Sequence, residues 1–291
     1  MLRKSLKTLC LLGVGLSILA SCGGSDFDTS KSISVTTRED GSGTKSAFME
    51  IIGLKGKSDV SNAIIATGTA AVLQEVKSNP YAIAFDSLGY ITSDVKMLKV
   101  DGVEATLDNI KSGDYSIARP LNVIYKEDTI NNSTLYTSYL GFLSSKDAQS
   151  IITENGYVVP GSTGADYSID ATLTGSIKIS GSTSLQPLMV KLASKYEELQ
   201  PKVTVEVSGG GSGTGYSNGE NGTSTFGMIS EVFNTTKAPS CTYYTVAKDG
   251  IAIIVNNANT YTNITKDQLK NIYNVEQDTA TKITKWSDLG E

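Results

Sequence analysis

Hydrophobic and polar positions follow two different periods along this chain. Short runs rich in β-branched and apolar residues, at 33–37, 82–85, 203–207 and 251–255, have the pattern of buried or half-buried strands. Residues 185–199 instead place apolar side chains three and four positions apart, which predicts an amphipathic helix. Because strand-like and helix-like segments alternate, the pattern favours an α/β sandwich with a largely parallel sheet.

Glycine-rich loops interrupt this pattern at three places. The tetrapeptide Gly-Ser-Gly-Thr occurs at 41–44 and again at 211–214, and Gly-Ser-Thr-Ser occurs at 181–184. The loops at 41 and 181 follow strand-like runs and precede helix-like segments, so free amide groups at a helix start can converge on one small anion. Each loop taken alone is also compatible with an ordinary turn. Three of them in one chain favour an oxyanion receptor.

The first 21 residues have the pattern of a secretory signal peptide. Arg3, Lys4 and Lys7 precede an apolar stretch that is shorter than the roughly 20 residues of a membrane-spanning helix. The ending Leu-Ala-Ser-Cys resembles a bacterial lipobox, which implies cleavage before Cys22 and lipidation of that residue. An ordinary signal with a chance cysteine is the alternative. We expect an exported protein, lipid-anchored on the outer face of the cytoplasmic membrane or in the periplasm, with residues 22–31 as a tether.

Composition narrows the chemistry of such a receptor. The 291-residue chain contains no histidine, which excludes Ser-His-Asp and Cys-His catalysis and histidine metal sites. Its net charge of −5 argues against nucleic acid and anionic membrane surfaces as partners. An anion therefore has to be held by local dipoles and by one or two buried cations. We expect no cofactor, no metal and no catalytic residue.

Several segments together resemble the PstS-type phosphate-binding proteins of bacterial ABC importers, over nearly all of the chain beyond the signal. The similar segments are Ile-Ser-Gly-Ser-Thr-Ser-Leu-Gln-Pro-Leu at 179–188, the glycine-rich run at 209–215, Phe-Gly-Met-Ile-Ser-Glu at 226–231, Asp-Gly-Ile-Ala-Ile-Ile-Val at 249–255 and Arg-Glu-Asp-Gly-Ser-Gly-Thr at 38–44. The resemblance implies an α/β, two-lobed periplasmic-binding-protein type II fold. Each lobe would have a mixed, largely parallel sheet flanked by helices.

The order of these segments departs from the family. Residues 33–160 resemble its second half, yet they precede residues 175–290, which resemble its first half. The chain therefore reads as circularly permuted, with residues 156–175 as a linker between the ordinary termini. A fragment of two tandem copies is the alternative, but the lipobox directly ahead of residue 32 argues for a real gene order.

Permutation also changes which lobe is continuous. We expect a continuous lobe over 87–255 and a discontinuous lobe that combines 32–86 with 256–291. The two chain ends would then pair inside one lobe. That lobe should fray first, because its two halves meet only through non-local contacts.

Carried over residue by residue, the resemblance predicts a phosphate site shared by the two lobes. Its residues are Arg38, Ser42, Gly43 and Thr44 on the discontinuous lobe, and Thr183, Ser184, Ser212 and Glu231 on the continuous lobe. Arg38 would supply the charged donors, while hydroxyl and amide groups would supply neutral ones. Asp40 would support Arg38 by partly neutralising it.

Glu231 is the residue expected to discriminate between anions. An ionised carboxylate only accepts hydrogen bonds, and at neutral pH phosphate still carries a proton to donate whereas sulfate carries none. The family commonly has Asp or Arg at this position, so the longer Glu side chain would reach the anion directly or through a water molecule. A solvated charge after a strand is the alternative interpretation of Glu231.

The resemblance implies a monomeric solute-binding lipoprotein that captures inorganic phosphate in an interlobe cleft and delivers it to the membrane subunits of an ABC importer. One alternative is a phosphate sensor, scavenger or surface adhesin that is not coupled to transport. Another is a receptor for a different oxyanion. A hydrolase or transferase acting on phosphate esters lacks support, because the sequence has neither a P-loop nor clustered acidic metal ligands.

Overall fold

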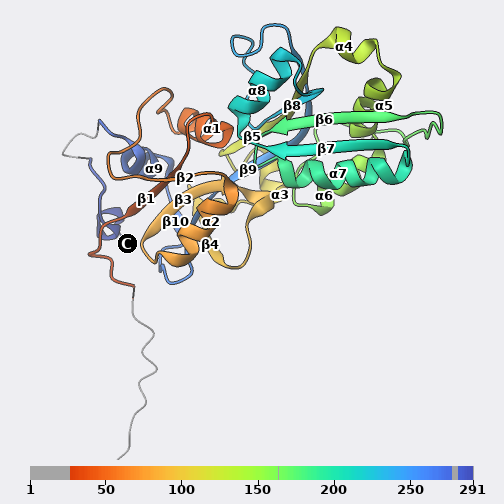
Figure 1. Ribbon diagram of the computed structural model, residues 1–291. Coiled ribbons are helices and arrows are strands. Elements are labelled where there is room, and N and C mark those ends of the chain that lie inside the picture. The colour runs from red at the N-terminus through yellow and green to blue at the C-terminus, as the bar shows by residue number, and fades with distance from the viewer. Residues whose placement is uncertain (1–26, 163, 277–280, 291) are drawn as a thin grey trace, which may run out of the picture.

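The computed structural model describes residues 27–162, 164–276 and 281–290. The predicted signal peptide at 1–21 and the predicted lipidation site Cys22 lie outside the described residues. The chain forms two α/β lobes side by side, and the lobe on the left of Figure 1 carries both ends of the described chain. Among the described residues, no helix is both long enough and apolar enough to cross a membrane.

The lobe of the chain ends is built on a mixed sheet. Its strands are β1 (Ser34–Arg38), β2 (Ile64–Ala66), β3 (Ala82–Ser87), β4 (Val95–Val100) and β10 (Asn263–Ile264), and its helices are α1 (Gly43–Ile51), α2 (Thr69–Ser78), α3 (Leu107–Ser112) and α9 (Lys266–Tyr273), with the short 3-10 turns η1 (Leu88–Tyr90) and η2 (Trp286–Leu289). Strand β1 lies between β2 and β3 and is parallel to both, and β10 is parallel to β4. The carboxyl end of β1 therefore leads directly to the start of α1.

The second lobe has the same plan. Its strands are β5 (Ala118–Tyr125), β6 (Gly175–Gly181), β7 (Val203–Gly209) and β8 (Phe226–Ile229), and its helices are α4 (Glu127–Asn131), α5 (Thr134–Leu143), α6 (Lys146–Glu154), α7 (Gln186–Leu199) and α8 (Ser212–Asn221). Strand β6 is parallel to β7 and β8, in register from the pair Gly175 and Val203 to the pair Gly181 and Gly209. Helices α7 and α8 consequently begin at the same edge of this sheet.

One long strand, β9 (Thr242–Asn256), belongs to both lobes. Its first part pairs antiparallel with β5, and its last part pairs antiparallel with β3 and β4. The predicted α/β, two-lobed arrangement with parallel pairs inside each lobe is thus confirmed, with antiparallel pairs added where β9 connects the lobes.

Buried side chains form two large clusters, one in each lobe. One cluster of buried residues draws its members from 121–247. The other joins Ile33 and Trp286 with Leu98, Ile110 and Ile117. Residues 95–117 thus pack with the chain ends, because β4 is held by the last part of β9 and by β10. Between these two clusters the chain changes over near 118 and 250, and the lobe boundaries at 87 and 255 stay a prediction.

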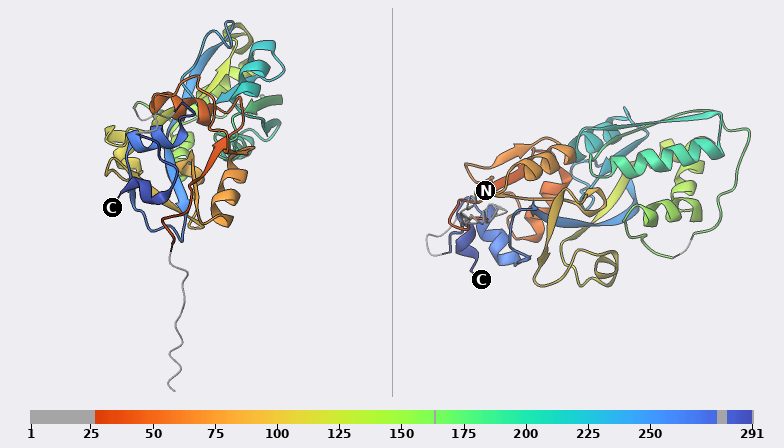
Figure 2. Two further views of the ribbon diagram at one scale, coloured as in Figure 1. Left: turned by 90° about the vertical axis from the view of Figure 1, so that its left-hand side faces the viewer. Right: turned by 90° about the horizontal axis from the view of Figure 1, so that it is seen from below.

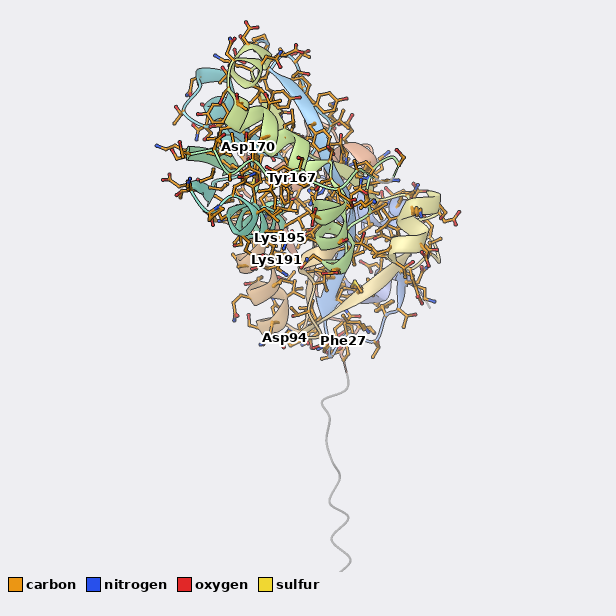
Figure 3. All side chains as sticks on the ribbon, turned by 90° about the vertical axis from the view of Figure 1, so that its right-hand side faces the viewer. Phe27, Asp94, Tyr167, Asp170, Lys191 and Lys195 are labelled. Carbon is orange, nitrogen blue, oxygen red and sulfur yellow. The ribbon has the colours of Figure 1, made fainter. Side chains whose placement is uncertain are left out.

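The expected linker is anchored at several of its described residues. The Tyr157 side chain is buried, and Val158 exchanges two backbone hydrogen bonds with Lys248 of β9, at 3.0 and 2.8 Å. Further along, the Tyr167 ring lies 5.5 Å from that of Phe142 in α5. Figure 3 shows Tyr167 and Asp170 on the same side of the molecule as Lys191 and Lys195 of α7. This connection therefore packs on the second lobe instead of hanging free.

The two ends of the described chain meet in one lobe (Figure 2). The Ile33 amide donates to the Thr284 carbonyl at 2.8 Å, and the Trp286 amide donates to the Lys31 carbonyl at 3.2 Å. The Phe27 ring lies edge-on to Trp286, with centroids 5.5 Å apart. Residues 27–31 of the expected tether are therefore packed onto η2, since they supply hydrogen-bond acceptors and a ring to the chain end.

Truncation of Trp286 should show how much this junction contributes. The side chain is fully buried and its indole donates to the Tyr81 carbonyl at 3.2 Å, so Trp286→Ala should lower the free energy of unfolding by about 3–5 kcal/mol. Urea unfolding monitored by circular dichroism measures this difference. The exposed Ile169 provides the control, because Ile169→Ala removes apolar side-chain atoms from the surface. An equal, small effect of both substitutions would contradict a structural role for the junction.

Candidate functional site

The glycine-rich loops of the two lobes meet face to face. The loop before α1 follows β1, and the loops before α7 and α8 follow β6 and β7. The Gly213 amide of α8 donates to the Gly41 carbonyl at 2.9 Å, which joins the lobes directly. Because parallel strands end at a common edge, the amino termini of these helices converge, and helix amino termini favour anions.

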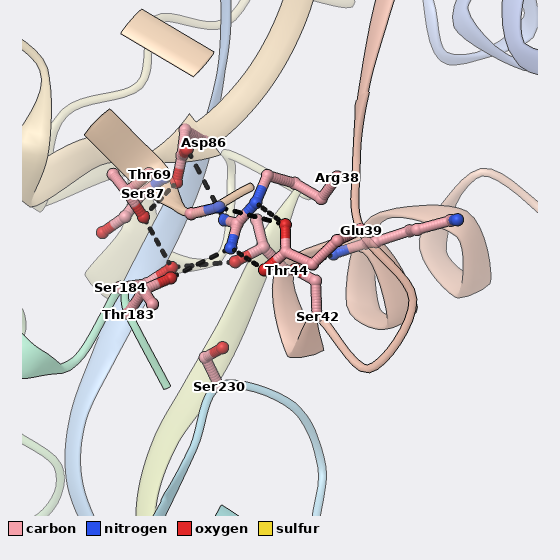
Figure 4. Close-up of polar contacts among 12 residues, drawn as sticks. Arg38, Glu39, Ser42, Thr44, Thr69, Asp86, Ser87, Thr183, Ser184 and Ser230 are labelled. Atoms are coloured by element: carbon pink, nitrogen blue, oxygen red, sulfur yellow. Dashed lines mark hydrogen bonds and ion pairs between the residues drawn. The ribbon is translucent and has the colours of Figure 1, made fainter. Parts of the chain in front are cut away.

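Arg38 is the cation at this junction. Its side chain is 1% exposed, although it stands at the end of β1 between the lobes. Atoms Nε and Nη2 donate to the two carboxylate oxygens of Glu39, both at 2.9 Å, and Nη2 also donates to Thr183 Oγ1 of the other lobe at 2.9 Å (Figure 4). Nη1 lies 3.7 Å from Asp86 Oδ2 and has no hydrogen-bond partner. The structure thus brings together Arg38 and Thr183, as predicted.

A line of hydroxyl groups continues from Arg38 across the junction. Thr44 Oγ1 and Ser184 Oγ lie 2.8 Å apart, and Ser184 Oγ lies 3.5 Å from Thr69 Oγ1. Thr69, the first residue of α2, donates to Asp86 Oδ1 at 3.3 Å. These hydroxyls are buried, and hydroxyl hydrogens can rotate to serve either a neighbour or a bound oxygen atom.

The remaining small residues complete the same junction. Ser42 caps α1 by accepting from the Lys45 amide at 3.3 Å. Ser212 Oγ, at the start of α8, accepts from the Ser230 amide at 3.0 Å and lies 3.3 Å from Ser230 Oγ. Gly43 faces these two serines so closely that a methyl group there would collide with Ser212 Oγ. Seven of the eight predicted residues therefore lie at this junction.

Glu231, the eighth residue, points elsewhere. Its side chain is 8% exposed, and Oε1 accepts from Lys237 Nζ at 2.8 Å. Burial raises the pKa of the Tyr216 hydroxyl, and the nearby Glu231 carboxylate raises it further. Its backbone is adjacent to Ser230, but its hydrogen bond with Lys237 holds the carboxylate on the second lobe.

Asp40 does not support Arg38 as the sequence had suggested. Its carboxylate is fully exposed and accepts from Lys45 Nζ at 2.9 Å, which lowers the pKa of Asp40. The reason is geometric: Arg38 points into the junction, whereas the turn at 39–42 carries Asp40 outward. The carboxylates beside Arg38 are Glu39 and Asp86.

These two carboxyl groups have opposite pKa shifts. Burial alone would raise the pKa of Glu39, but the hydrogen bonds and charge of Arg38 hold it below its ordinary value. Burial raises the pKa of Asp86, and the charge of Arg38 only partly offsets that effect. Glu39 is therefore the firmly ionised counterion, while Asp86 is a fully buried carboxyl group with an unpaired oxygen.

A second buried ion pair lies next to the junction, between β5 and β9. Arg119 of β5 donates through Nη2 to Asp249 of β9 at 3.0 Å and through Nη1 to the Ser230 carbonyl at 3.1 Å. Strands β5 and β9 connect the lobes, and this pair joins them to the loop that carries Ser230. Sequence analysis had treated the segment that begins at Asp249 only as a family-like stretch, and it had not identified Thr69, Asp86 and Ser230 as neighbours of the site. Their only signal was a polar residue at a strand end or helix start.

Comparisons with known proteins show which family the chain belongs to. The chain matches the family described as a PBP superfamily domain over residues 25–147 and 167–291. Phosphate-binding protein PstS 2 of Streptococcus agalactiae serotype V is 35% identical over 302 aligned positions, which take in 99% of this chain and 100% of that protein. Phosphate-binding protein PstS of Bacillus subtilis is 37% identical over 121 positions, 40% of this chain and 38% of that protein.

Among solved structures, a phosphate-binding protein of a phosphate ABC transporter from Streptococcus pneumoniae TIGR4 has a TM-score of 0.71 with this chain. The two are 32% identical, and the similarity covers 89% of this chain and 100% of that one. The fold, the converging loops and the full-length relatives lead to one assignment: this chain belongs to the PstS-type family of the PBP superfamily.

Proposed function

We propose that this protein captures inorganic phosphate between its two lobes and delivers it to an ABC importer. The observation that carries the proposal is the direct meeting of a buried cation, Arg38, with hydroxyl groups and helix amino termini from both lobes. A relative that aligns with 99% of this chain is named for phosphate binding, and so is a solved structure that covers 89% of it. No chemical step is needed, because closure around a bound anion is itself a signal that a membrane partner can recognise.

The proposed site consists of Arg38, Ser42, Gly43, Thr44, Thr183, Ser184, Ser212 and Glu231. A tetrahedral anion offers several acceptor oxygens, and this set offers guanidinium, hydroxyl and backbone amide donors from loops on opposite lobes. An anion that contacts both lobes at once favours the closed arrangement. It shifts the closure equilibrium by the difference between its binding free energies in the closed and the open forms.

Isothermal titration calorimetry with a panel of anions tests this proposal. The purified protein should bind phosphate and arsenate, two tetrahedral anions that carry a proton at neutral pH, and should bind sulfate and molybdate more weakly. Tighter binding of sulfate than phosphate would contradict the assignment. Transport is tested separately, by measuring phosphate uptake in cells that lack the gene.

Glu231→Gln should narrow the difference between phosphate and sulfate affinity. We propose that the Glu231 carboxylate turns from Lys237 toward the anion and accepts the phosphate proton, an interaction that sulfate cannot make. A glutamine amide can donate to either anion, so sulfate affinity should rise by about tenfold while phosphate affinity falls by a similar factor. Unchanged selectivity in calorimetric titrations would remove Glu231 from the mechanism.

We propose export and anchoring through a lipid on Cys22, and a monomeric state. Mass spectrometry of the protein purified from membranes tests the lipid, and light scattering tests the monomer.

We also propose that the chain is a circular permutant. In its support, the full-length relatives align over nearly the entire chain, whereas the Bacillus subtilis protein aligns over only 40% of it.

A further inference from the structure

Two carboxylates flank the Arg38 guanidinium, and they hold it unequally (Figure 4). Glu39 accepts from Nε and Nη2, both at 2.9 Å. Asp86 approaches the other end, where its Oδ2 lies 3.7 Å from Nη1. Arg38 Nη1 and Asp86 Oδ2 are both buried, and neither atom has a hydrogen-bond partner. A small rotation of the guanidinium toward Asp86 would satisfy both atoms, but the two bonds to Glu39 oppose it.

The two carboxylates also differ in freedom. The Asp86 side chain is 0% exposed and is fixed by the Ser87 amide at 2.7 Å and by the Thr69 hydroxyl at 3.3 Å. The Glu39 side chain is 22% exposed, and beyond Arg38 its hydrogen bond is to the Gly68 amide at 3.1 Å. Glu39 therefore has a route to solvent, whereas Asp86 cannot leave Arg38 without disrupting β3.

The donors that Glu39 uses are of the kind that a bound anion requires. They are the bidentate edge of a guanidinium and a backbone amide at the start of α2. The carboxylate also lies close to the second lobe, because a methyl group at Gly211 would be 3.9 Å from Glu39 Oε1. An anion that contacts Arg38, Thr183 and the loop at 211 would thus have a negative charge beside it and would compete with Glu39 for the same donors.

We propose that Glu39 is a displaceable counterion that competes with phosphate for Arg38, and that Asp86 is the fixed counterion to which Arg38 turns when Glu39 leaves. This inference rests on the proposed function and adds a switch to it. Entry of phosphate would break the hydrogen bonds of Arg38 with Glu39 and form the missing one between Nη1 and Asp86. The exchange lowers affinity for any anion that cannot displace a carboxylate from a guanidinium.

Glu39→Gln tests the inference by two measurements with opposite expected signs. Calorimetry should show phosphate binding about tenfold tighter, since a neighbouring negative charge is removed. The melting temperature without added phosphate should fall, because the ion pair with Arg38 is lost. Glu50→Gln is the matched control: Glu50 pairs with Lys55 on the exposed side of α1, and this variant should keep the wild-type affinity. Unchanged or weaker phosphate binding by Glu39→Gln would overturn the inference.

Asp86→Asn gives a second, independent result. It should weaken phosphate binding about tenfold, and in the double variant the gain from Glu39→Gln should shrink, because Arg38 then has no carboxyl group to turn to. Equal gains with and without Asp86 would show that Asp86 takes no part. If Asp86→Asn does not fold, the Glu39→Gln result alone decides.

A wild-type protein that binds no phosphate overturns the proposed function and this inference together, whereas wild-type binding with unchanged Glu39→Gln affinity overturns only the inference.

Discussion

Replacing Arg38 by alanine should weaken phosphate binding about 30- to 4,000-fold, because truncating one partner of a buried, hydrogen-bonded charge pair costs about 2–5 kcal/mol. Arg38 is the buried cation at the junction of the lobes, and it contacts Thr183 on the opposite lobe. Its loss also leaves Glu39 and Asp86 without a countercharge. The variant should therefore melt at a lower temperature as well, and calorimetric titrations have to be made well below that temperature.

Lys146→Ala is the control for a change in net charge. Lys146 pairs with Asp166 on the surface of the second lobe, and both side chains are more than half exposed, so this variant should bind phosphate like the wild type. If the Arg38→Ala protein binds phosphate with a dissociation constant within threefold of the wild-type value, the binding cation is elsewhere. Arg119, the other buried arginine among the described residues, would then be the residue to test.

Gly43→Ala should hold the lobes apart and weaken phosphate binding by roughly 5- to 150-fold, the equivalent of the 1–3 kcal/mol that overpacking costs. An added methyl group would collide with Ser212 Oγ and would lie 2.8 Å from Ser230 Oγ. Gly43 belongs to one lobe and both serines belong to the other. Each lobe should therefore keep its fold while the contact between them is lost.

The measurement combines calorimetry with small-angle X-ray scattering. Wild-type protein should become more compact on addition of phosphate, and Gly43→Ala should not. Gly141→Ala is the matched control, because Gly141 lies within α5 and an added methyl group meets nothing within 4 Å. A Gly43→Ala protein that closes and binds like the wild type would mean that the loops at 43 and 212 do not form the contact on which binding depends.

The sequence predicted the elements of the site well, because they depend on local chemistry. The helix expected after the Gly-Ser-Gly-Thr loop at 41–44 corresponds to α1, although the role of Ser42 as its cap was found only in the structure. The amphipathic pattern over 185–199 corresponds to α7, and the run at 203–207 corresponds to most of β7. Such features are set by side-chain periodicity and turn geometry within about 20 residues.

The division into lobes was harder to predict, because it depends on pairing between distant strands. Residues 95–117 have no local feature that assigns them to either lobe. Their place is decided by β4 pairing with the end of β9, more than 150 residues later. Burial of Leu98 and Ile110 against Ile33 and Trp286 stabilises that arrangement, and only the tertiary structure reveals it.

What the sequence alone determined is the set of donors: an arginine, hydroxyl residues and glycine-rich turns at the starts of helices, in a chain without histidine. Tertiary structure decided which charges surround that arginine. Asp40 is two residues away yet turns to solvent with Lys45, whereas Asp86, 48 residues away, lies beside Nη1. The reason is physical: proximity along the chain sets what a residue can reach, but the pairing of β1 with β3 fixes which carboxylate is buried beside the cation and which stays hydrated.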